Sequence, residues 1–169
     1  SVSDIAEAKD LILTAQGGLS SDERWARETL PQVELLRGQF HITKQSVLLD
    51  FGAGIGRVAK ELIEQTGCCV IGVDISANMR ALGQEFCNSP SYITCLVKGL
   101  KSLLSNGLRA DFAYSVWVLQ HSVDPWGDIE LLFDSLVDGG GLYVLNLVYS
   151  VLPTEDDWAF KDLDLNPLL

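Results

Sequence analysis

Long hydrophobic runs, paired cysteine motifs and positive charge are all scarce in this sequence. No stretch reaches the ~18 apolar residues of a membrane span, and the four cysteines lack zinc-ligand spacing, so we expect no membrane association and no metal site. The 12 Lys and Arg against 23 Asp and Glu give a net charge of −11, which disfavours nucleic acid as a partner. Cysteines without a pairing pattern and a start without an apolar leader predict a cytoplasmic protein.

The composition is that of a globular protein. The chain has 169 residues, of which 47% are hydrophobic and 21% are charged. This length suits one domain, so we predict a single domain over residues 1–169. Within it we expect N-terminal helices over 1–40, a core over 45–148 and an acidic tail over 149–169.

The first forty residues predict helices. Ile5, Ala8 and Ile12 recur at helical spacing and would share one face. Ser20 stands three residues before Glu23, the spacing of a capping box at the start of a second helix. Pro31 lies within that helix, and we expect it to kink or split the helix.

After residue 45, short apolar runs alternate with helical patterns. The runs predict five strands, at 47–51, 69–74, 92–97, 111–117 and 142–148. Helical spacing or caps place helices over 55–66, 76–87 and 129–136, and Gly139–Gly141 predicts a turn into the last strand. Alternation of this kind predicts an α/β fold with a doubly wound, mainly parallel sheet, whose ligands bind beyond the carboxyl ends of the strands.

Two motifs follow the first two strands. A glycine-rich loop, Asp50–Gly56, opens a helix, and Asp74 closes the second strand, where a carboxylate can accept both hydroxyls of a ribose. A dinucleotide motif would have glycine or alanine where this chain has Arg57, and Asp50 would repel a pyrophosphate. A ligand with both an amino group and a ribose suits the two acids, and S-adenosylmethionine has both.

Three segments together resemble class I S-adenosylmethionine-dependent methyltransferases. They are 47–79 with the two motifs, 111–121 at the fourth strand, and 136–142 before the fifth, and the likeness covers about residues 45–148. The resemblance implies a Rossmann-like sheet in the strand order 3-2-1-4-5. We expect the family's sixth and seventh strands to be missing. The open fifth strand would then be covered by the tail, by chain absent from this sequence or by a second copy in a homo-oligomer.

The resemblance also implies a set of cofactor-binding residues. The methionine end would lie against Asp50, Gly52, Ala53, Gly54 and Gly56, and Asp74 would bind the ribose. Ile75 and Met79 would flank the adenine, and Val116 and Trp117 would lie near the methyl group. Gly99 and Leu100 stand where the family often has Gly-Asp beside the adenine, so that acidic contact is lost here.

The expected activity is methyl transfer from S-adenosylmethionine to an unidentified acceptor, with a small molecule favoured. His121, just after the fourth strand, is the candidate general base. Two alternatives stay open at this point. One is an S-adenosylmethionine-binding protein without turnover, which Leu100 and the short C-terminus would suit. The other is a nicotinamide-dependent oxidoreductase, against which Arg57 argues.

Overall fold

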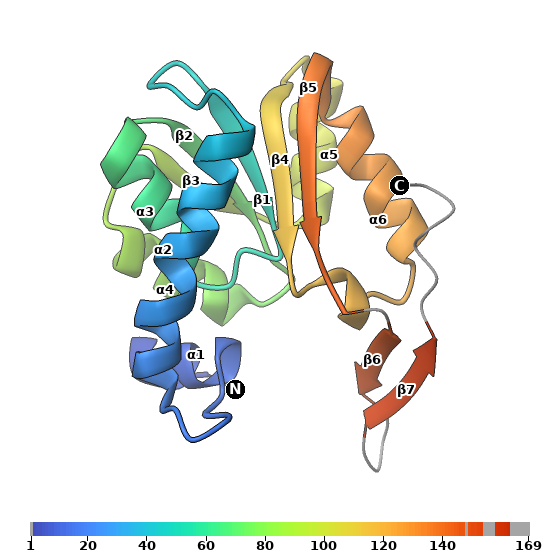
Figure 1. Ribbon diagram of the computed structural model, residues 1–169. Coiled ribbons are helices and arrows are strands. Elements are labelled where there is room, and N and C mark those ends of the chain that lie inside the picture. The colour runs from blue at the N-terminus through green and yellow to red at the C-terminus, as the bar shows by residue number, and fades with distance from the viewer. Residues whose placement is uncertain (1, 148, 154–157, 163–169) are drawn as a thin grey trace.

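The computed structural model describes residues 2–147, 149–153 and 158–162. Five strands form one parallel sheet in the order β3-β2-β1-β4-β5, which confirms the predicted doubly wound fold (Figure 1). The strands are β1 (Val47–Phe51), β2 (Cys69–Val73), β3 (Tyr92–Cys95), β4 (Ala110–Val116) and β5 (Leu136–Leu145).

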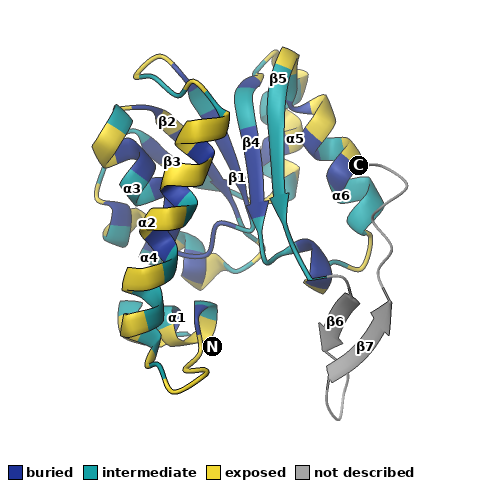
Figure 2. Cartoon of the chain, viewed as in Figure 1, coloured by how far each residue is buried: buried dark blue, intermediate teal, exposed yellow. Residues whose placement is uncertain are grey.

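Helices cover both faces of this sheet. On one face, apolar side chains of α2 (Ser21–Gln39), α3 (Arg57–Thr66) and α4 (Ala77–Cys87) join a core cluster with β1, β2 and β4. On the other, α5 (Val97–Ser105) and α6 (Pro125–Asp134) form a second cluster. The central strands are therefore buried on both sides, as Figure 2 shows, which explains their nearly continuous apolar sequences.

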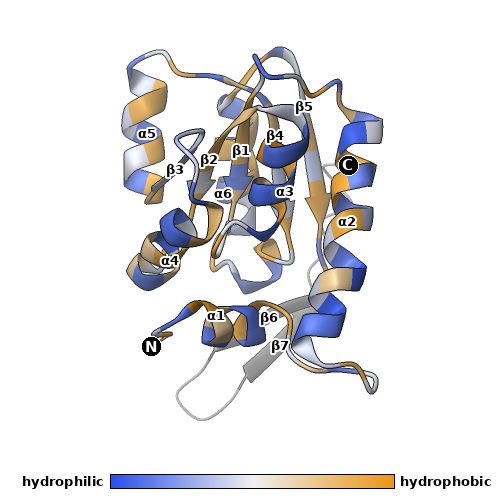
Figure 3. Cartoon of the chain, turned by 90° about the vertical axis from the view of Figure 1, so that its left-hand side faces the viewer, coloured by the Kyte–Doolittle hydropathy of each residue, from blue (hydrophilic) through white to orange (hydrophobic). Residues whose placement is uncertain are grey.

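Smaller elements gather at the end of the sheet to which the strands point. Helix α1 (Ile5–Ile12) lies below this edge, and a short 3₁₀-helix η1 (Leu119–His121) follows β4 (Figures 1 and 3). Strands β6 (Tyr149–Pro153) and β7 (Trp158–Asp162) pair only with each other, antiparallel, at the same end. The loops of this carboxyl edge therefore lie between α1 and the β6–β7 hairpin.

Helix α2 begins as its sequence predicts but does not break where expected. The Ser20 side chain accepts from the backbone of Glu23, and the Glu23 carboxylate accepts from the backbone of Ser20 at 2.8 Å, which completes the capping box. Pro31 nevertheless lies inside one continuous helix. The expected split is wrong because packing of Val33 and Leu36 against the sheet holds the helix together after the proline.

The third strand and the helix after it also differ from the prediction. Strand β3 ends at Cys95 instead of residue 97, and α5 begins at Val97. Leu96 and Val97 are apolar like the strand residues before them, so the sequence does not show where β3 ends and α5 begins. The spacing from Val97 to Leu100, both of which pack into the second core cluster, was the helical signal.

Strand β5 starts before the expected turn. It runs from Leu136 and includes the glycine run, with a register shift in its pairing between Ala110 and Phe112 of β4. Gly139 has φ +79, so the irregularity is local and the strand continues through it. Within the described residues no strand pairs with the outer edge of β5.

Candidate functional site at the carboxyl edge

The glycine-rich loop after β1 has a backbone that only glycine adopts freely. Gly52, Gly54 and Gly56 have φ values of +79, +54 and +80. The amides of Gly52 and Ala53 both donate to the carbonyl of Val73, at 2.7 and 3.0 Å, which fastens the loop to the end of β2. The last glycine is the N-cap of α3, so free amides of that helix open at this edge.

Neighbouring elements close tightly on two of these glycines. A side chain on Gly52 would collide with Val118, which follows β4. The position of a Cβ on Gly54 lies 2.9 Å from Cδ1 of Ile12 in α1. The loop is therefore enclosed by the end of β4 and by the N-terminal helix, and its glycines are needed for packing as well as for conformation.

Asp50 is the next-to-last residue of β1, and only 5% of its surface is exposed. Burial raises the pKa of this carboxyl to about 7. The Tyr114 hydroxyl and the Arg57 guanidinium oppose the rise, and Asp74 adds to it. The Tyr114 hydroxyl is near enough to act on Asp50 yet has no hydrogen-bond partner of standard geometry. A positively charged ligand group at this edge would therefore favour ionisation of Asp50.

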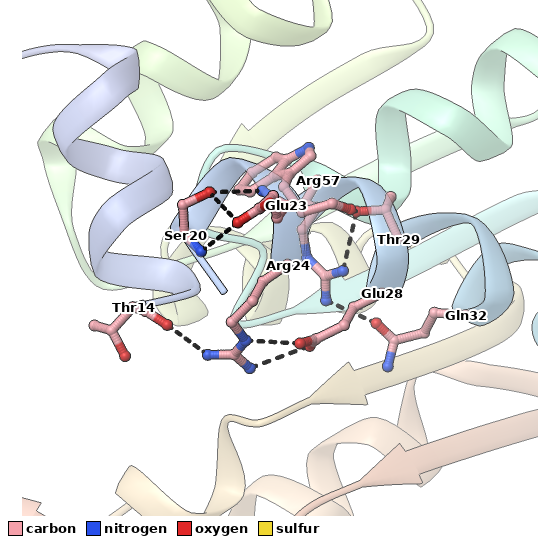
Figure 4. Close-up of polar contacts among 9 residues, drawn as sticks. Thr14, Ser20, Glu23, Arg24, Glu28, Thr29, Gln32 and Arg57 are labelled. Atoms are coloured by element: carbon pink, nitrogen blue, oxygen red, sulfur yellow. Dashed lines mark hydrogen bonds and ion pairs between the residues drawn. The ribbon is translucent and has the colours of Figure 1, made fainter. Parts of the chain in front are cut away.

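Arg57 turns away from the loop toward α2. Its guanidinium donates to Oγ1 of Thr29 at 3.2 Å and to Oε1 of Gln32 at 2.7 Å (Figure 4). It also lies 5.9 Å from the centre of the Trp25 ring. Burial lowers the pKa of Arg57, and the Asp50 charge opposes that change. In this position the Arg57 side chain anchors α2 to the start of α3, next to the loop.

Asp74 lies at the end of β2 beside the loop. Its Oδ2 accepts from the amide of Gly54 and its Oδ1 from the amide of Ser76, both at 2.8 Å. A carboxylate has about four lone-pair sites, so each oxygen can still accept a hydroxyl. Next to it, Ile75 is 85% exposed and offers an apolar side chain that a flat ring could cover.

Met79 is less accessible than expected. It lies in the first turn of α4, where Ser76 caps the helix as predicted, but only 7% of its surface is exposed. Its side chain packs with Ala8 and Ile55 in a small cluster beneath α1. Only the small part of the Met79 side chain that α1 does not cover is therefore accessible to a ligand.

The structure does not bring Leu100 to this edge. Gly99 and Leu100 lie inside α5, and Leu100 is fully buried in the core. The carbonyl of Cys95 accepts from the amide of Asp74 at 3.2 Å, so the residue beside the site is Leu96, which is 45% exposed. Sequence reasoning missed Leu96 because it placed the end of β3 two residues too late.

The end of β4 carries a strained residue. Val116 packs against the first core cluster, and the next residue, Trp117, is partly buried with φ +61. A side chain in this left-handed region costs about 1–2 kcal/mol. The Trp117 amide donates to the carbonyl of Leu145 at 2.7 Å, which fixes the strained peptide to β5.

A side-chain brace follows this residue. The backbone N–H of Gln120 donates to the side-chain Oδ1 of Asn146 at 2.9 Å. In return, the backbone N–H of Leu147 donates to the side-chain Oε1 of Gln120 at 3.0 Å. Because that bond fixes which end of the Gln120 amide is oxygen, its Nε2 faces Nε2 of His121 at 3.2 Å. An amide nitrogen only donates, so His121 must present a lone pair there. Sequence reasoning missed this brace, because it joins residues 26 positions apart that no local pattern connects.

The structure thus gathers most of the predicted residues at one edge: Asp50, Gly52, Ala53, Gly54, Gly56, Asp74, Ile75, Val116, Trp117 and His121. Within the part of the chain that the structure describes, no three His, Cys, Asp or Glu side chains are grouped to hold a metal ion. Among the same residues, no helix is long and apolar enough to cross a membrane.

Comparison with solved structures shows where this fold recurs. An S-adenosyl-L-methionine-dependent methyltransferase from Methanococcus maripaludis, described as putative by its name, matches 85% of the chain at 17% identity, with TM-score 0.66. A Thiobacillus denitrificans methyltransferase in complex with S-adenosyl-L-homocysteine matches 90% at 15% identity, with TM-score 0.57. Phosphoethanolamine N-methyltransferase 2 of Haemonchus contortus, in complex with S-adenosyl-L-methionine, matches 75% at 21% identity, with TM-score 0.57.

The chain spans 64%, 55% and 30% of the lengths of these three proteins. No curated protein sequence gives a significant match. The profile of a methyltransferase domain family matches residues 49–144, which include the glycine-rich loop, Asp74, the end of β4 and all of β5 but its last residue. With this match over more than half of its length, the chain belongs to the methyltransferase domain family, and it shares the Rossmann-like fold of the S-adenosylmethionine-dependent methyltransferases that it resembles.

Proposed function

We propose that this chain transfers a methyl group from S-adenosylmethionine to a small-molecule acceptor. The observation that carries the proposal is the meeting of two carboxylates, Asp50 and Asp74, with a left-handed glycine loop at one sheet edge. With Asp50 at the start of the loop and Asp74 beside it, the site suits a ligand with a cationic amino group and a ribose, and suits a pyrophosphate poorly.

Each part of the cofactor has residues that fit it. The spare lone pairs of Asp74 accept the ribose hydroxyls, while Asp50 attracts the amino group as it ionises. The loop backbone lies against the methionine chain, and exposed Ile75 covers one face of the adenine. The bound cofactor supplies a methyl group on a positively charged sulfur atom.

The acceptor would enter beside the end of β4, near Val116 and Trp117. In a direct displacement, holding acceptor and methyl group in line supplies much of the rate enhancement. His121 is the candidate base, but Gln120 already engages Nε2 of its ring. Proton removal through that nitrogen therefore requires the contact to open, and we rank His121 below the two acids in importance.

We also propose that residues 1–169 act as one domain. The N-terminal helices are tied to the sheet by the Arg57 contacts to α2 and by a 2.8 Å bond from Nδ2 of Asn78 to the carbonyl of Val2. They also cover the glycine loop through Ile12. Removing them would therefore uncover the site.

Calorimetric titration with S-adenosylhomocysteine, S-adenosylmethionine and NAD tests the proposal. We expect the first two to bind and NAD not to bind. Asp74→Ala should weaken S-adenosylhomocysteine binding by about 1–3 kcal/mol, the usual result of leaving buried polar groups unpaired. Asp138→Ala, at an exposed position of β5, is the matched control.

Turnover is tested separately, by release of S-adenosylhomocysteine from S-adenosylmethionine in the presence of a panel of small-molecule acceptors. Binding of the cofactor without release for any acceptor would favour a binding protein without turnover. Binding of NAD in preference to both sulfur ligands would refute the proposal.

A further inference from the structure

The side chain of Tyr114 ends in a hydroxyl group that packing does not explain. Tyr114 is only 1% exposed, and its hydroxyl has no hydrogen-bond partner of standard geometry. Burying a hydroxyl without a partner costs stability, so such a group in a native fold calls for an explanation. The ring itself packs in the first core cluster, where a phenylalanine ring would serve equally well.

This hydroxyl lies beside the carboxyl group of Asp50. In the sheet, Asp50 of β1 is the register partner of Tyr114 of β4, so the two side chains point to the same face. The two groups act on each other's ionisation. The hydroxyl lowers the pKa of Asp50, and the charge of Asp50 adds to the rise that burial causes in the pKa of Tyr114. Asp50 is therefore an acceptor within reach of this hydroxyl.

Two neutral groups also face Asp50, from β3 and α4. The Tyr92 hydroxyl occupies the space that a side chain on Gly72, the β2 partner of Asp50, would need. The Cys87 thiol donates to the carbonyl of Ile55 at 3.7 Å. Burial raises the pKa of Cys87 to about 12, and it raises the pKa of Tyr92 as well. Both groups therefore stay protonated in the pH range in which Asp50 titrates.

The charged side chains near Asp50 leave an ionised carboxyl without a paired cation. Arg57 of α3 lowers the pKa of Asp50, but its guanidinium is bound to Thr29 and Gln32 of α2 (Figure 4). Asp74, directly after β2, raises the pKa of Asp50. The ion pairs of the described residues do not include Asp50. A cation that pairs with this carboxyl would therefore come from a bound ligand.

Ionisation of Asp50 decides how strongly the Tyr114 hydroxyl can bind to it. A carboxylate accepts at both oxygens, and hydrogen bonds to an ionised group are about twice as strong as those between neutral groups. Ionisation would therefore give the buried hydroxyl a strong acceptor, and the hydroxyl would in turn stabilise the charge. A bound cation and the Tyr114 hydroxyl would thus favour the same carboxylate form.

We propose that Tyr114 is a positioning residue whose hydroxyl holds Asp50 as a carboxylate toward the amino group of the cofactor, and that cofactor binding expels the Asp50 proton. The O–H bond of the neutral acid breaks and its proton passes to the solvent. The remaining carboxylate accepts from Tyr114 and pairs with the cationic amino group. The inference rests on the proposed function, since it assumes that this amino group lies at Asp50.

The proton is counted by calorimetric titration with S-adenosylhomocysteine in two buffers of different ionisation enthalpy. Asp50 has a pKa of about 7 in the ligand-free chain. We therefore expect the wild type to release close to one proton per bound ligand at about pH 6 and almost none at about pH 8.5. Asp50→Asn should release none at either pH, which would assign the proton to Asp50.

Tyr114→Phe keeps the ring and removes the hydroxyl. It should raise the pKa of Asp50, so that proton release persists to higher pH, and it should weaken binding at about pH 6 by about tenfold or more. The loss of affinity should be smaller at about pH 8.5, where more of Asp50 is already ionised. At about pH 6 the ligand-free variant should unfold at an equal or higher temperature than the wild type, because an unpaired buried hydroxyl is gone.

Tyr143→Phe is the matched control. Tyr143 of β5 is the register partner of Tyr114, so it shares the same face of the sheet, but burial alone raises the pKa of its hydroxyl. This variant should release protons with the same pH dependence as the wild type.

Four results would overturn the inference while the proposed function stands. They are wild-type binding without proton release at about pH 6, release that persists in Asp50→Asn, a wild-type pH profile in Tyr114→Phe, and an equal shift of the profile in Tyr143→Phe. A wild-type chain that binds no S-adenosylhomocysteine at any pH would overturn the proposed function and this inference with it.

Discussion

At Asp50, folding favours the neutral carboxylic acid, whereas the proposed cationic ligand favours the ionised carboxylate. Burial raises the pKa of this carboxyl from 3.8 to about 7. Between these two values the folded chain holds a proton that the unfolded chain has released. The free energy of unfolding therefore falls as pH rises through this window, and above it the buried charge remains as a destabilising group. A cationic ligand beside Asp50 would offset that loss.

Replacing this carboxyl should stabilise the chain and weaken the site. We expect Asp50→Asn to unfold with a higher free energy than the wild type at about pH 8, by up to about 4 kcal/mol, because the amide carries no buried charge. The advantage should shrink as the pH falls toward about 3, below both pKa values, where wild-type Asp50 is largely protonated in both states. Urea unfolding at several pH values measures this, and calorimetry should show weaker S-adenosylhomocysteine binding.

Asp10→Asn, at an exposed position of α1, controls for the loss of one negative charge. A stability difference between Asp50→Asn and wild type that stays constant over this pH range would contradict the raised pKa. Loss of stability in the variant at all pH values would mean that the charged form is the one that the fold requires.

The sequence could predict the residues of this site where the signal is local. Asp50 is the next-to-last residue of β1, and Gly52 and Asp74 directly follow β1 and β2, so their place at the edge follows from strand ends alone. The Gln120–Asn146 bond joins residues 26 positions apart, and no local pattern reveals it. The left-handed φ of Trp117 was equally hidden, because no turn residue marks it.

At the scale of elements, helix-capping residues predicted element boundaries better than proline and glycine did. The side-chain caps of α2 and α4 lie where sequence spacing placed them. Pro31 and the glycine run of β5 interrupt neither element, because packing and pairing with neighbours outweigh one lost hydrogen bond or one flexible residue. In this chain the side-chain caps therefore mark where these two helices start, whereas proline and glycine are weaker guides to where an element ends.

Helix α1 is attached to the rest of the fold through a small apolar cluster. It has eight residues, too few to be stable alone, and Ala8 is its only fully buried residue. We expect Ala8→Glu to detach α1 from Ile55 and Met79, with a loss of about 1–3 kcal/mol in stability. Hydrogen exchange over residues 5–12 should become fast while the amides of β1 and β4 stay protected.

The matched control is Ala6→Glu, which adds the same charge to the same helix at an exposed position. It should leave hydrogen exchange in α1 unchanged. If Ala8→Glu also leaves it unchanged, α1 is held by contacts other than this cluster, and its cover over Gly54 is firmer than we infer.

At the scale of the whole molecule, an open sheet edge and a large net charge act against each other. The outer edge of β5 has no partner strand among the described residues, and such edges promote pairing with another chain. The net charge of −11 makes two copies repel each other. Added salt screens this repulsion but leaves the edge unchanged. Self-association should therefore increase as the salt concentration rises.

A single proline should separate these two effects. Leu145 turns its carbonyl toward β4, where it accepts from Trp117, so the peptide groups of Val144 face the open edge by the alternation of a strand. Val144→Pro removes an outward donor without touching the pairing with β4, and edge strands tolerate proline.

In sedimentation velocity we expect the wild type to self-associate more at about 0.5 M than at about 0.05 M NaCl. Val144→Pro should stay monomeric at both, whereas Val144→Thr, which keeps the amide and the branched shape, should behave as the wild type. A wild-type chain that is monomeric at every salt and protein concentration would show that the edge of β5 does not pair.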